Sequence, residues 1–184
     1  MNRIAVFVDA GYFYASASEL LFGAPLRRGE LRLANAEFAH YLAQVAETIG
    51  GCPLLRIYWY DGASTGPNAA HVALAYRPNL KLRLGRVDAQ GQQQGVDQLL
   101  VADLVTLAKN RALCDAVLVT GDDDLRDGVE EAQALGVRVH LIGIPPAREN
   151  QAAALVQAAD SVRELSSAEL KSFLSLAPKR SSGA

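Results

Sequence analysis

The sequence predicts an α/β fold with a mostly parallel sheet that helices cover on both faces. Short apolar runs typical of buried strands alternate with segments whose apolar residues repeat at helical spacing, and this alternation continues through most of the 184 residues. Parallel strands joined by right-handed helical crossovers produce this order of elements. The composition, 50% hydrophobic and 21% charged, indicates that the chain can bury one sizeable core.

The first expected elements lie before residue 52. Ile4 to Val8 is a continuous apolar run, which is typical of a buried strand, and Tyr12 to Phe22 has the apolar spacing of a helix. Ala36 to Ile49 is the second expected helix. Asn35 precedes this helix as the expected N-cap and Gly50-Gly51 follows it, so both ends carry residues that commonly begin and end helices.

The middle of the chain adds two strands and two helices. Leu54 to Tyr60 is apolar and aromatic and predicts a strand, and a short helix is expected at Ala69 to Ala75. Leu80 to Val87 alternates leucines with basic residues, which is the half-buried pattern of a strand at a sheet edge. After the polar loop DAQGQQQG, a helix is expected from Val96 to about Ala112.

The last part of the chain repeats the alternation. Ala116 to Val119 predicts a buried strand, and Leu125 to Leu135 predicts a helix that ends at Gly136. The closing elements are expected at residues 137–144 (strand), 149–158 (helix) and 162–165 (strand).

One domain is expected over residues 1–166, followed at residues 167–184 by a helix remnant and a tail without fixed structure, because the closing stretch APKRSSGA is small, polar and basic. No apolar stretch approaches membrane-spanning length, and the chain enters its first strand without a charged and apolar leader. A cytoplasmic protein with no membrane partner is therefore expected. The sequence leaves the oligomeric state open, a homodimer included.

Charge and cysteine content narrow the classes of site. The net charge is −2, so binding to nucleic acid would have to rest on a local basic patch. Cys52 and Cys114 lack the C-x-x-C spacing of common metal sites, which indicates packed thiols rather than a disulfide framework or a zinc site. No G-x-G-x-x-G motif follows the first strand and no P-loop occurs, so dinucleotide and nucleoside triphosphate sites lack their usual signatures.

Aspartates gather where the strands are expected to end. Asp9 directly follows the first apolar run, and the run ending in VLVTGDDD brings Asp122 and Asp124 to the same edge of the sheet. Asp97 lies in the first turn of the helix that begins after Gly95. Taken singly, each is explained as a turn or helix-terminal residue. Because open parallel sheets bind ligands at the carboxyl ends of their strands, the four are expected to face one site.

Asp103 is harder to explain as a surface charge, because it lies on or beside the apolar stripe of its helix. A carboxylate that faces a core has to be paired, hydrogen-bonded, protonated or bound to a cation. Several converging carboxylates raise one another's pKa values, and a divalent cation removes that conflict. Magnesium prefers oxygen ligands and keeps waters that can attack a phosphodiester, so the pattern predicts a magnesium site of one or two ions.

The chain carries three motifs in the order VFVDAG, GVDQLLVADL and VLVTGDDDL, and the last is followed by LGVRVHLIGI. Together these motifs resemble the NYN domain of the PIN-like nuclease superfamily, in its LabA-like branch. The resemblance spans about residues 3–165. It implies a three-layer α/β/α sandwich with PIN-like, Rossmann-like topology and a Mg²⁺- or Mn²⁺-dependent ribonuclease site. It places the metal ligands on Asp9, Asp97, Asp122 and Asp124 and matches Asp103 to a recurrent acidic position, so all five are candidate catalytic residues.

Candidate contacts to an RNA substrate lie on two segments. Lys81, Arg83 and Arg86 are expected to line one face of the edge strand, where they either bind phosphates or form a solvated face. Tyr12 and Tyr14 follow the first aspartate closely, and they either stack on bases beside the metal or pack into the core. The sequence does not separate RNA from single-stranded DNA.

Two positions depart from the resembled pattern and keep a second function open. In the family that this chain resembles, asparagine is frequent in the region that holds Tyr12 and its neighbours here. Lysine commonly precedes the G-V-D motif in that family, whereas this chain has Gln94. These departures favour the alternative of a non-catalytic RNA-binding or regulatory module that retains the acidic pocket.

Overall fold

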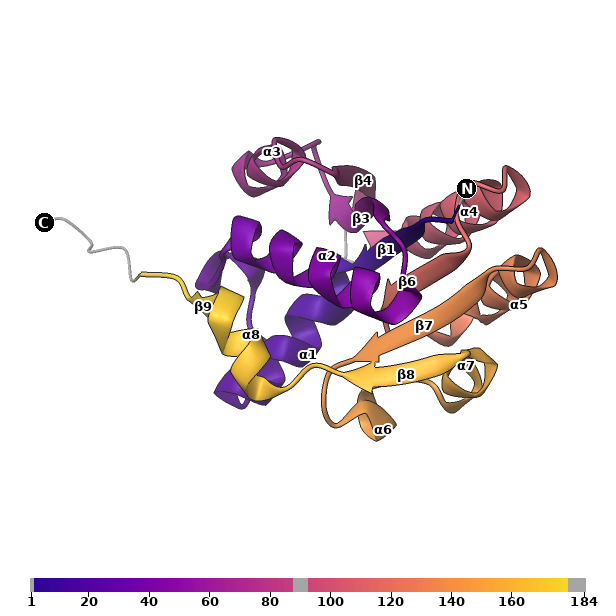
Figure 1. The fold of residues 1–184 in the computed structure, drawn as a ribbon. Coiled ribbons are helices and arrows are strands. Elements are labelled where there is room, and N and C mark those ends of the chain that lie inside the picture. The colour runs from indigo at the N-terminus through magenta and orange to yellow at the C-terminus, as the bar shows by residue number, and fades with distance from the viewer. Residues whose placement is uncertain (1, 88–92, 179–184) are drawn as a thin grey trace, which may run out of the picture.

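The computed structural model describes residues 2–87 and 93–178 and confirms the α/β fold (Figure 1). The strands of its main sheet are β1 (Ile4–Asp9), β3 (Leu54–Ala63), β4 (Leu80–Val87), β5 (Gln93–Gln94), β6 (Asp115–Val119), β7 (Arg138–Gly143) and β8 (Ser161–Glu164). In the described residues, these seven strands are ordered β5-β4-β3-β1-β6-β7-β8, and every neighbouring pair is parallel except β4 and β5.

Helices cover both faces of this sheet. They are α1 (Ala10–Phe22), α2 (Asn35–Gly50), α3 (Ala69–Ala75), α4 (Val96–Lys109), α5 (Arg126–Ala134), α6 (Ala147–Asn150), α7 (Ala153–Ala158) and α8 (Ser167–Phe173), with 3₁₀ turns at Arg28–Glu30 and Asp123–Leu125. Figure 1 shows α1, α2 and α8 on one face and α4, α5 and α7 on the other, which completes the three-layer sandwich. None of the described helices is long and apolar enough to cross a bilayer.

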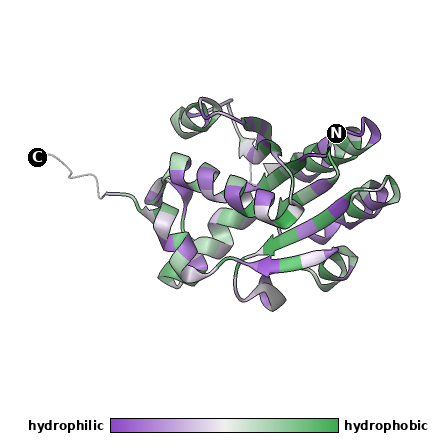
Figure 2. Ribbon diagram, viewed as in Figure 1, coloured by the Kyte–Doolittle hydropathy of each residue, from purple (hydrophilic) through white to green (hydrophobic). Residues whose placement is uncertain are grey.

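Each face of the sheet has its own apolar core. Neighbouring residues of β1 point to opposite faces, so Val8 packs under α1 and α2 whereas Phe7 packs under α4. The core under α1 is aromatic: the ring centroid of Phe13 lies 5.9 Å from that of Trp59 and 6.4 Å from that of Phe173. Figure 2 shows the hydrophobic residues concentrated in the central strands. Burial on both faces explains why these strands are continuous apolar runs.

Most expected elements are confirmed to within a few residues, but the single helix expected at residues 149–158 is wrong. The chain forms α6 and α7 instead, with Gln151 and Ala152 between them. Gln151 is buried and its Nε2 donates a hydrogen bond to the carbonyl oxygen of Thr120 at 2.8 Å. The N–H of Ala152 donates to the carbonyl oxygen of Gly121 at 2.9 Å. These bonds attach the interruption to the loop that follows β6.

A second, two-stranded sheet was not predicted. β2 (Leu31–Leu33) pairs antiparallel with β9 (Leu174–Leu176), and strands of three residues are too short for alternation to identify them. Phe173 of α8 lies in the core under α1. Asn35 is the first residue of α2 rather than its N-cap, which is Ala34. Residues 179–184 of the expected tail and residues 88–92 of the polar loop lie outside the described residues.

The order of the strands reverses beside β1. From β1 the sheet extends through β3 and β4 on one side and through β6, β7 and β8 on the other. Open α/β sheets bind ligands beyond the carboxyl ends of the strands at such a reversal. Asp9 ends β1 and Asp122 follows β6, so the reversal lies between two of the predicted site residues.

Candidate functional site

Asp9 is the buried member of the predicted acidic group. It is 8% exposed and caps α1, because its Oδ1 accepts hydrogen bonds from the backbone N–H groups of Gly11 at 2.8 Å and Tyr12 at 3.2 Å. Burial, together with the nearby carboxylates of Asp97 and Asp122, raises the pKa of Asp9 to about 6 although the two N–H groups lower it. The helix therefore orients a carboxylate whose charged form is destabilised.

Three further aspartates approach Asp9 from α4 and from the loop after β6. Asp97 lies in the first turn of α4, and its pKa is raised by burial and by the charges of Asp122 and Asp124. The Oδ1 atom of Asp122 accepts a hydrogen bond from the N–H of Asp124 at 3.0 Å. Asp97 and Asp124 also line one cavity of about 490 Å³. The four predicted ligands are therefore electrostatic neighbours in the folded chain.

In the part of the chain that the structure describes, the four carboxylates have no compensating cation. Within residues 2–87 and 93–178, no lysine, arginine or histidine forms an ion pair with Asp9, Asp97, Asp122 or Asp124. Lys109 lines the same cavity, but its Nζ pairs with Glu131 at 2.8 Å. A group of carboxylate oxygens is the donor set that hard cations such as Mg²⁺ or Mn²⁺ prefer. The donor types therefore suit such an ion, although among the described residues no three of these carboxylates lie close enough together to hold one as they stand.

Thr120 connects the two halves of the acidic group and was not predicted. It is fully buried, and its Oγ1 donates to Oδ2 of Asp9 at 3.5 Å and accepts from the N–H of Asp122 at 3.4 Å. A hydroxyl residue at the end of the VLVT run is the signal that could have identified it. That signal is weak, because threonine is common in ordinary strands.

Asp103 differs from the four other aspartates because it forms an ion pair with Arg83. Its carboxylate accepts two hydrogen bonds from Arg83, from Nε at 2.7 Å and from Nη2 at 2.8 Å. The hydroxyl of Tyr60 donates a third at 2.9 Å. These partners explain how a carboxylate can lie beside the apolar stripe without a metal ion. They favour a structural role that joins α4 to β4, and a role as supporting acid stays a prediction.

Replacing Arg83 with methionine is expected to lower the free energy of unfolding by about 1–2 kcal/mol, because Asp103 loses its cation. The two side chains are 33% and 19% exposed, so the cost stays below that of a fully buried pair. Urea unfolding followed by the fluorescence of Trp59 measures the change. Lys81→Met, on an exposed residue of the same strand, is the control and is expected to stay within about 0.5 kcal/mol. Equal effects of the two substitutions would contradict the structural role.

The two tyrosines of α1 have different surroundings. The hydroxyl oxygen of Tyr12 accepts a hydrogen bond from the N–H of Ile144 at 3.0 Å, and the ring lies against Gly121. Tyr14 packs edge-on against Trp59, with the guanidinium of Arg28 5.2 Å from its ring centroid. Tyr12 therefore supports the loop that carries the aspartates, while Tyr14 packs away from that loop. Base stacking by either ring stays a prediction.

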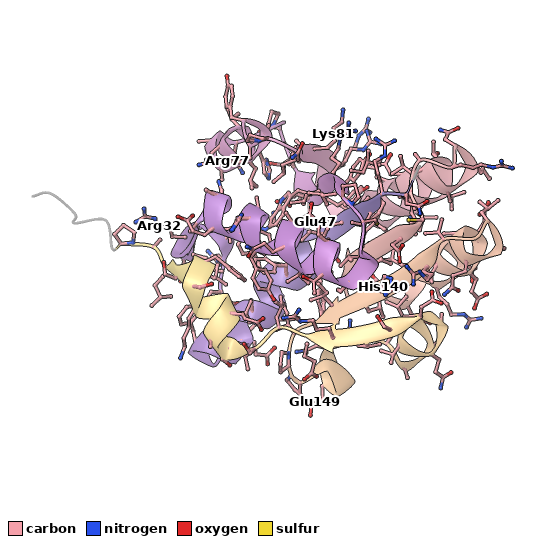
Figure 3. The ribbon with its side chains drawn as sticks, viewed as in Figure 1. Arg32, Glu47, Arg77, Lys81, His140 and Glu149 are labelled. Carbon is pink, nitrogen blue, oxygen red and sulfur yellow. The ribbon has the colours of Figure 1, made fainter. Side chains whose placement is uncertain are left out.

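The basic residues of β4 do not form one continuous face. Because successive residues in a strand point to opposite sides, Arg86 is in phase with Leu82 and Leu84 rather than with Lys81 and Arg83. Lys81 is exposed and lies at the upper edge of the molecule in Figure 3. Contacts of Lys81 and Arg86 with RNA therefore stay two separate predictions.

A second buried carboxylate lies near the end of β3 and was not predicted. Asp61 is 2% exposed, pairs with Arg28 and lies 3.0 Å from Nε2 of His71. It shares with Asp9 the signal of an aspartate late in an apolar strand. Unlike Asp9, it has a cation beside it. Position in the fold alone therefore does not identify a metal ligand, and the uncompensated charge is what distinguishes the acidic group.

The charge of Asp9 is expected to destabilise the metal-free chain above about pH 6. The pKa of Asp9 is about 6 in the folded chain, above the value of about 3.9 for an exposed aspartate. At a pH between these two values, the folded state keeps a proton on Asp9 that the unfolded state has lost. The stability that this proton provides is lost as the pH rises through about 6. Asp9→Asn is therefore expected to be about 3 kcal/mol more stable than the unsubstituted chain at pH 7.5, and equally stable at pH 4. Denaturant titrations with chelator test this, and a difference that does not vary with pH would contradict it.

Comparisons with known proteins agree with this architecture. A family profile described as "NYN domain" matches residues 3–166. An uncharacterized protein, y4oD of Sinorhizobium fredii, is 50% identical over 109 residues, which cover 59% of this chain and 51% of that protein. The match thus spans about half the length of that relative. A protein of unknown function from Vibrio parahaemolyticus has a similar structure over 95% of this chain and 97% of its own, with a TM-score of 0.62 and 16% identity, which shows the fold alone.

Proposed function

We propose that this chain, which belongs to the NYN domain family of the PIN-like nuclease superfamily, is a metal-dependent ribonuclease that hydrolyses phosphodiester bonds in RNA. The family is nuclease-like, and the proposal adds the metal ion, the substrate and catalysis by this chain. Neither relative described above has an assigned activity. The proposal therefore rests on the chemistry of the acidic group and its position in the fold.

The observation that supports the proposal most is the convergence of four uncompensated carboxylates at the reversal of strand order. Asp61 and Asp103, the other partly or fully buried aspartates near this end of the sheet, each have an arginine partner. Asp9 and Asp97 have none among the described residues, and their pKa values are raised. A phosphodiester is itself anionic, so it could approach this group only with a cation between them. A ribonuclease site of the metal-dependent kind meets that requirement.

The carboxylate oxygens of Asp9, Asp97, Asp122 and Asp124 would hold Mg²⁺ or Mn²⁺. When bound, such an ion supplies an activated water and stabilises negative charge on the phosphate. Asp9 is fixed in place by α1, and Thr120 links it to the loop of Asp122. Asp97 and Asp124 line the cavity of about 490 Å³, and a substrate phosphate would reach the group from this side.

The alternative is a non-catalytic RNA-binding or regulatory module that keeps the acidic pocket. The structural role of Tyr12, whose hydroxyl accepts a hydrogen bond from Ile144, is the observation that favours it, because this side chain supports the loop instead of presenting a free polar group to the substrate. The two functions differ in one measurable property: both bind RNA, and only the ribonuclease cuts it.

The test is cleavage of end-labelled RNAs, single-stranded and structured, and of single-stranded DNA, with Mg²⁺, with Mn²⁺ and with chelator. RNA fragments that form only with metal are the expected result. RNA binding without cutting in either metal would overturn the ribonuclease in favour of the binding module. An absence of cutting together with no heat of Mn²⁺ binding in calorimetry would overturn the metal site itself.

A further inference from the structure

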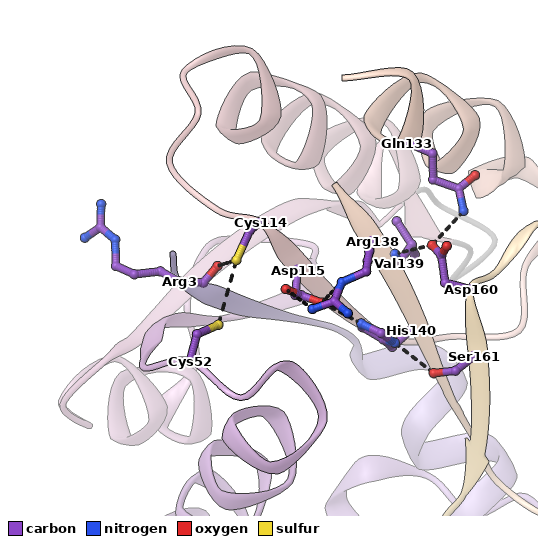
Figure 4. Close-up of polar contacts among 10 residues, drawn as sticks. All are labelled: Arg3, Cys52, Cys114, Asp115, Gln133, Arg138, Val139, His140, Asp160 and Ser161. Atoms are coloured by element: carbon purple, nitrogen blue, oxygen red, sulfur yellow. Dashed lines mark hydrogen bonds and ion pairs between the residues drawn. The ribbon is translucent and has the colours of Figure 1, made fainter. Parts of the chain in front are cut away.

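Cys52, Cys114 and Asp115 lie together (Figure 4). They are close to the starts of β1, β3 and β6, whereas Asp9 ends β1 and Asp122 follows β6. Cys52 lies on the bend between α2 and β3, Cys114 precedes β6, and Asp115 begins β6 beside Ile4, the first residue of β1. The Sγ atoms of the two cysteines are 3.8 Å apart. A carboxylate oxygen of Asp115 lies within 4.8 Å of both sulfurs. The chain has 2 cysteines in all, so this cluster contains every thiol it possesses.

The separation of the sulfurs fits a shared metal ion. Two thiolates bound to one tetrahedral Zn²⁺ at about 2.3 Å lie about 3.8 Å from each other. The carboxylate oxygen has to move closer, since a sulfur and an oxygen on such an ion are about 3.5 Å apart. Cys52 is half-buried and follows Gly51, whose φ is +63°, so it lies outside the regular elements that would hold it rigidly.

Asp115 is already oriented as a ligand by its surroundings. Its buried carboxylate accepts hydrogen bonds from Nε2 of His140 at 2.8 Å and from Nη2 of Arg138 at 3.0 Å, and it forms an ion pair with Nε of Arg138 at 2.9 Å. Nδ1 of His140 lies 2.8 Å from Oγ of Ser161, which fixes the imidazole ring. Burial alone would raise the pKa of Asp115, but the hydrogen bonds from His140, Arg138 and Cys114 lower it. Carboxylates that ligate metals are commonly held by such outer hydrogen bonds.

We propose that Cys52, Cys114 and Asp115 form a second cation site, separate from the acidic group, that binds a thiophilic divalent ion of the zinc type. Two thiolates and one carboxylate supply three negative charges, which the ion and the Arg138 guanidinium neutralise. The ion replaces the proton of each thiol, and both protons are released to solvent. A bound ion would connect the start of β3 to the start of β6, on either side of β1.

A disulfide is the competing use of this pair. Both thiols are free in the structure, and their Sγ atoms lie 3.8 Å apart, whereas a disulfide bond is about 2.05 Å long. A metal ion instead deprotonates a coordinating thiol directly.

The test is titration of the full chain with Co²⁺ in the presence of a phosphine reductant, followed by absorption spectroscopy. A thiolate-to-cobalt charge-transfer band in the near ultraviolet is expected as Co²⁺ binds, and Zn²⁺ added afterwards should remove the band because it binds such sites more tightly. Cys52→Ser and Cys114→Ser should each weaken binding at least about tenfold. Asp122→Asn is the matched control and should leave the band unchanged, because carboxylates of the acidic group produce no thiolate band.

Either of two results would overturn the proposal. One is the absence of a charge-transfer band at Co²⁺ concentrations well above that of the protein. The other is a band that persists with unchanged affinity in the Cys52→Ser variant, since a single thiol would then explain it. Loss of RNA cleavage in Asp122→Asn with the band intact would separate this site from the proposed ribonuclease site.

Discussion

An Asp122→Asn variant is expected to lose RNA cleavage by about 10²-fold or more in Mg²⁺ or Mn²⁺ while it keeps its fold. The substitution removes one of the charges that we propose hold the ion, and a loss of about 3 kcal/mol in transition-state stabilisation corresponds to that factor. Asp122 is exposed, and its hydrogen bond from the N–H of Asp124 can also be accepted by an asparagine oxygen. Initial cleavage rates and circular dichroism measure the two properties.

Asp123→Asn is the matched control for this variant. It removes the same charge at the neighbouring residue, which is exposed. The charge of Asp123 is not among those that raise the pKa values of Asp9 and Asp97. Its cleavage rate should stay within about twofold of the unsubstituted chain, because exposed charges away from the reacting atoms act weakly. Equal losses in both variants would indicate a general electrostatic effect, and an unchanged rate in Asp122→Asn would contradict its role as a ligand.

RNA binding separates a lost ligand from a lost substrate contact. With the metal ion at a saturating concentration, removing a negative charge near the site should leave affinity for a polyanion unchanged or strengthen it. A variant that binds RNA as well as the unsubstituted chain and cuts it about 10²-fold more slowly therefore loses catalysis and keeps recognition. This combination is expected for Asp122→Asn if its carboxylate holds the ion.

The order of elements in the main sheet could be predicted because its central strands are buried on both faces. Val8 and Phe7 point into different cores, so β1 contains no polar residue until Asp9 ends it. The same burial makes the end of each strand visible in the sequence. It therefore also located Asp9, the last residue of β1, and Asp122, which follows β6 after Thr120 and Gly121.

The sequence could not predict which carboxylates have partners. The Arg83 that neutralises Asp103 lies on another strand, and its contact exists only after β4 and α4 pack together. The proximity of Cys52 and Cys114 depends in the same way on two loops that meet beside the start of β1. Pairwise contacts between distant segments leave no periodic pattern in the chain, so their chemistry appears only in the folded structure.

A Gly121→Ala variant is expected to lose about 3 kcal/mol of stability and most of its cleavage activity. A Cβ atom at this position would overlap the carbonyl oxygen of Asn150 and lie 2.6 Å from Cε2 of Tyr12. A backbone oxygen cannot rotate away as a side chain can, so the loop after β6 has to separate from α6. Because Gly121 lies between Thr120 and Asp122, this movement breaks the link from Thr120 to Asp9 and displaces the aspartates that follow.

Gly29→Ala provides the comparison, since a Cβ there meets nothing within 4 Å. It should stay within about 0.5 kcal/mol in urea unfolding and cleave RNA at the unsubstituted rate. If the movement at Gly121 displaces the aspartates of the acidic group, they bind Mn²⁺ less tightly. The increase in the free energy of unfolding that saturating Mn²⁺ produces should then also be smaller. A Gly121→Ala chain that is destabilised yet gains as much stability from Mn²⁺ as Gly29→Ala would show that the loop and the ion site are independent.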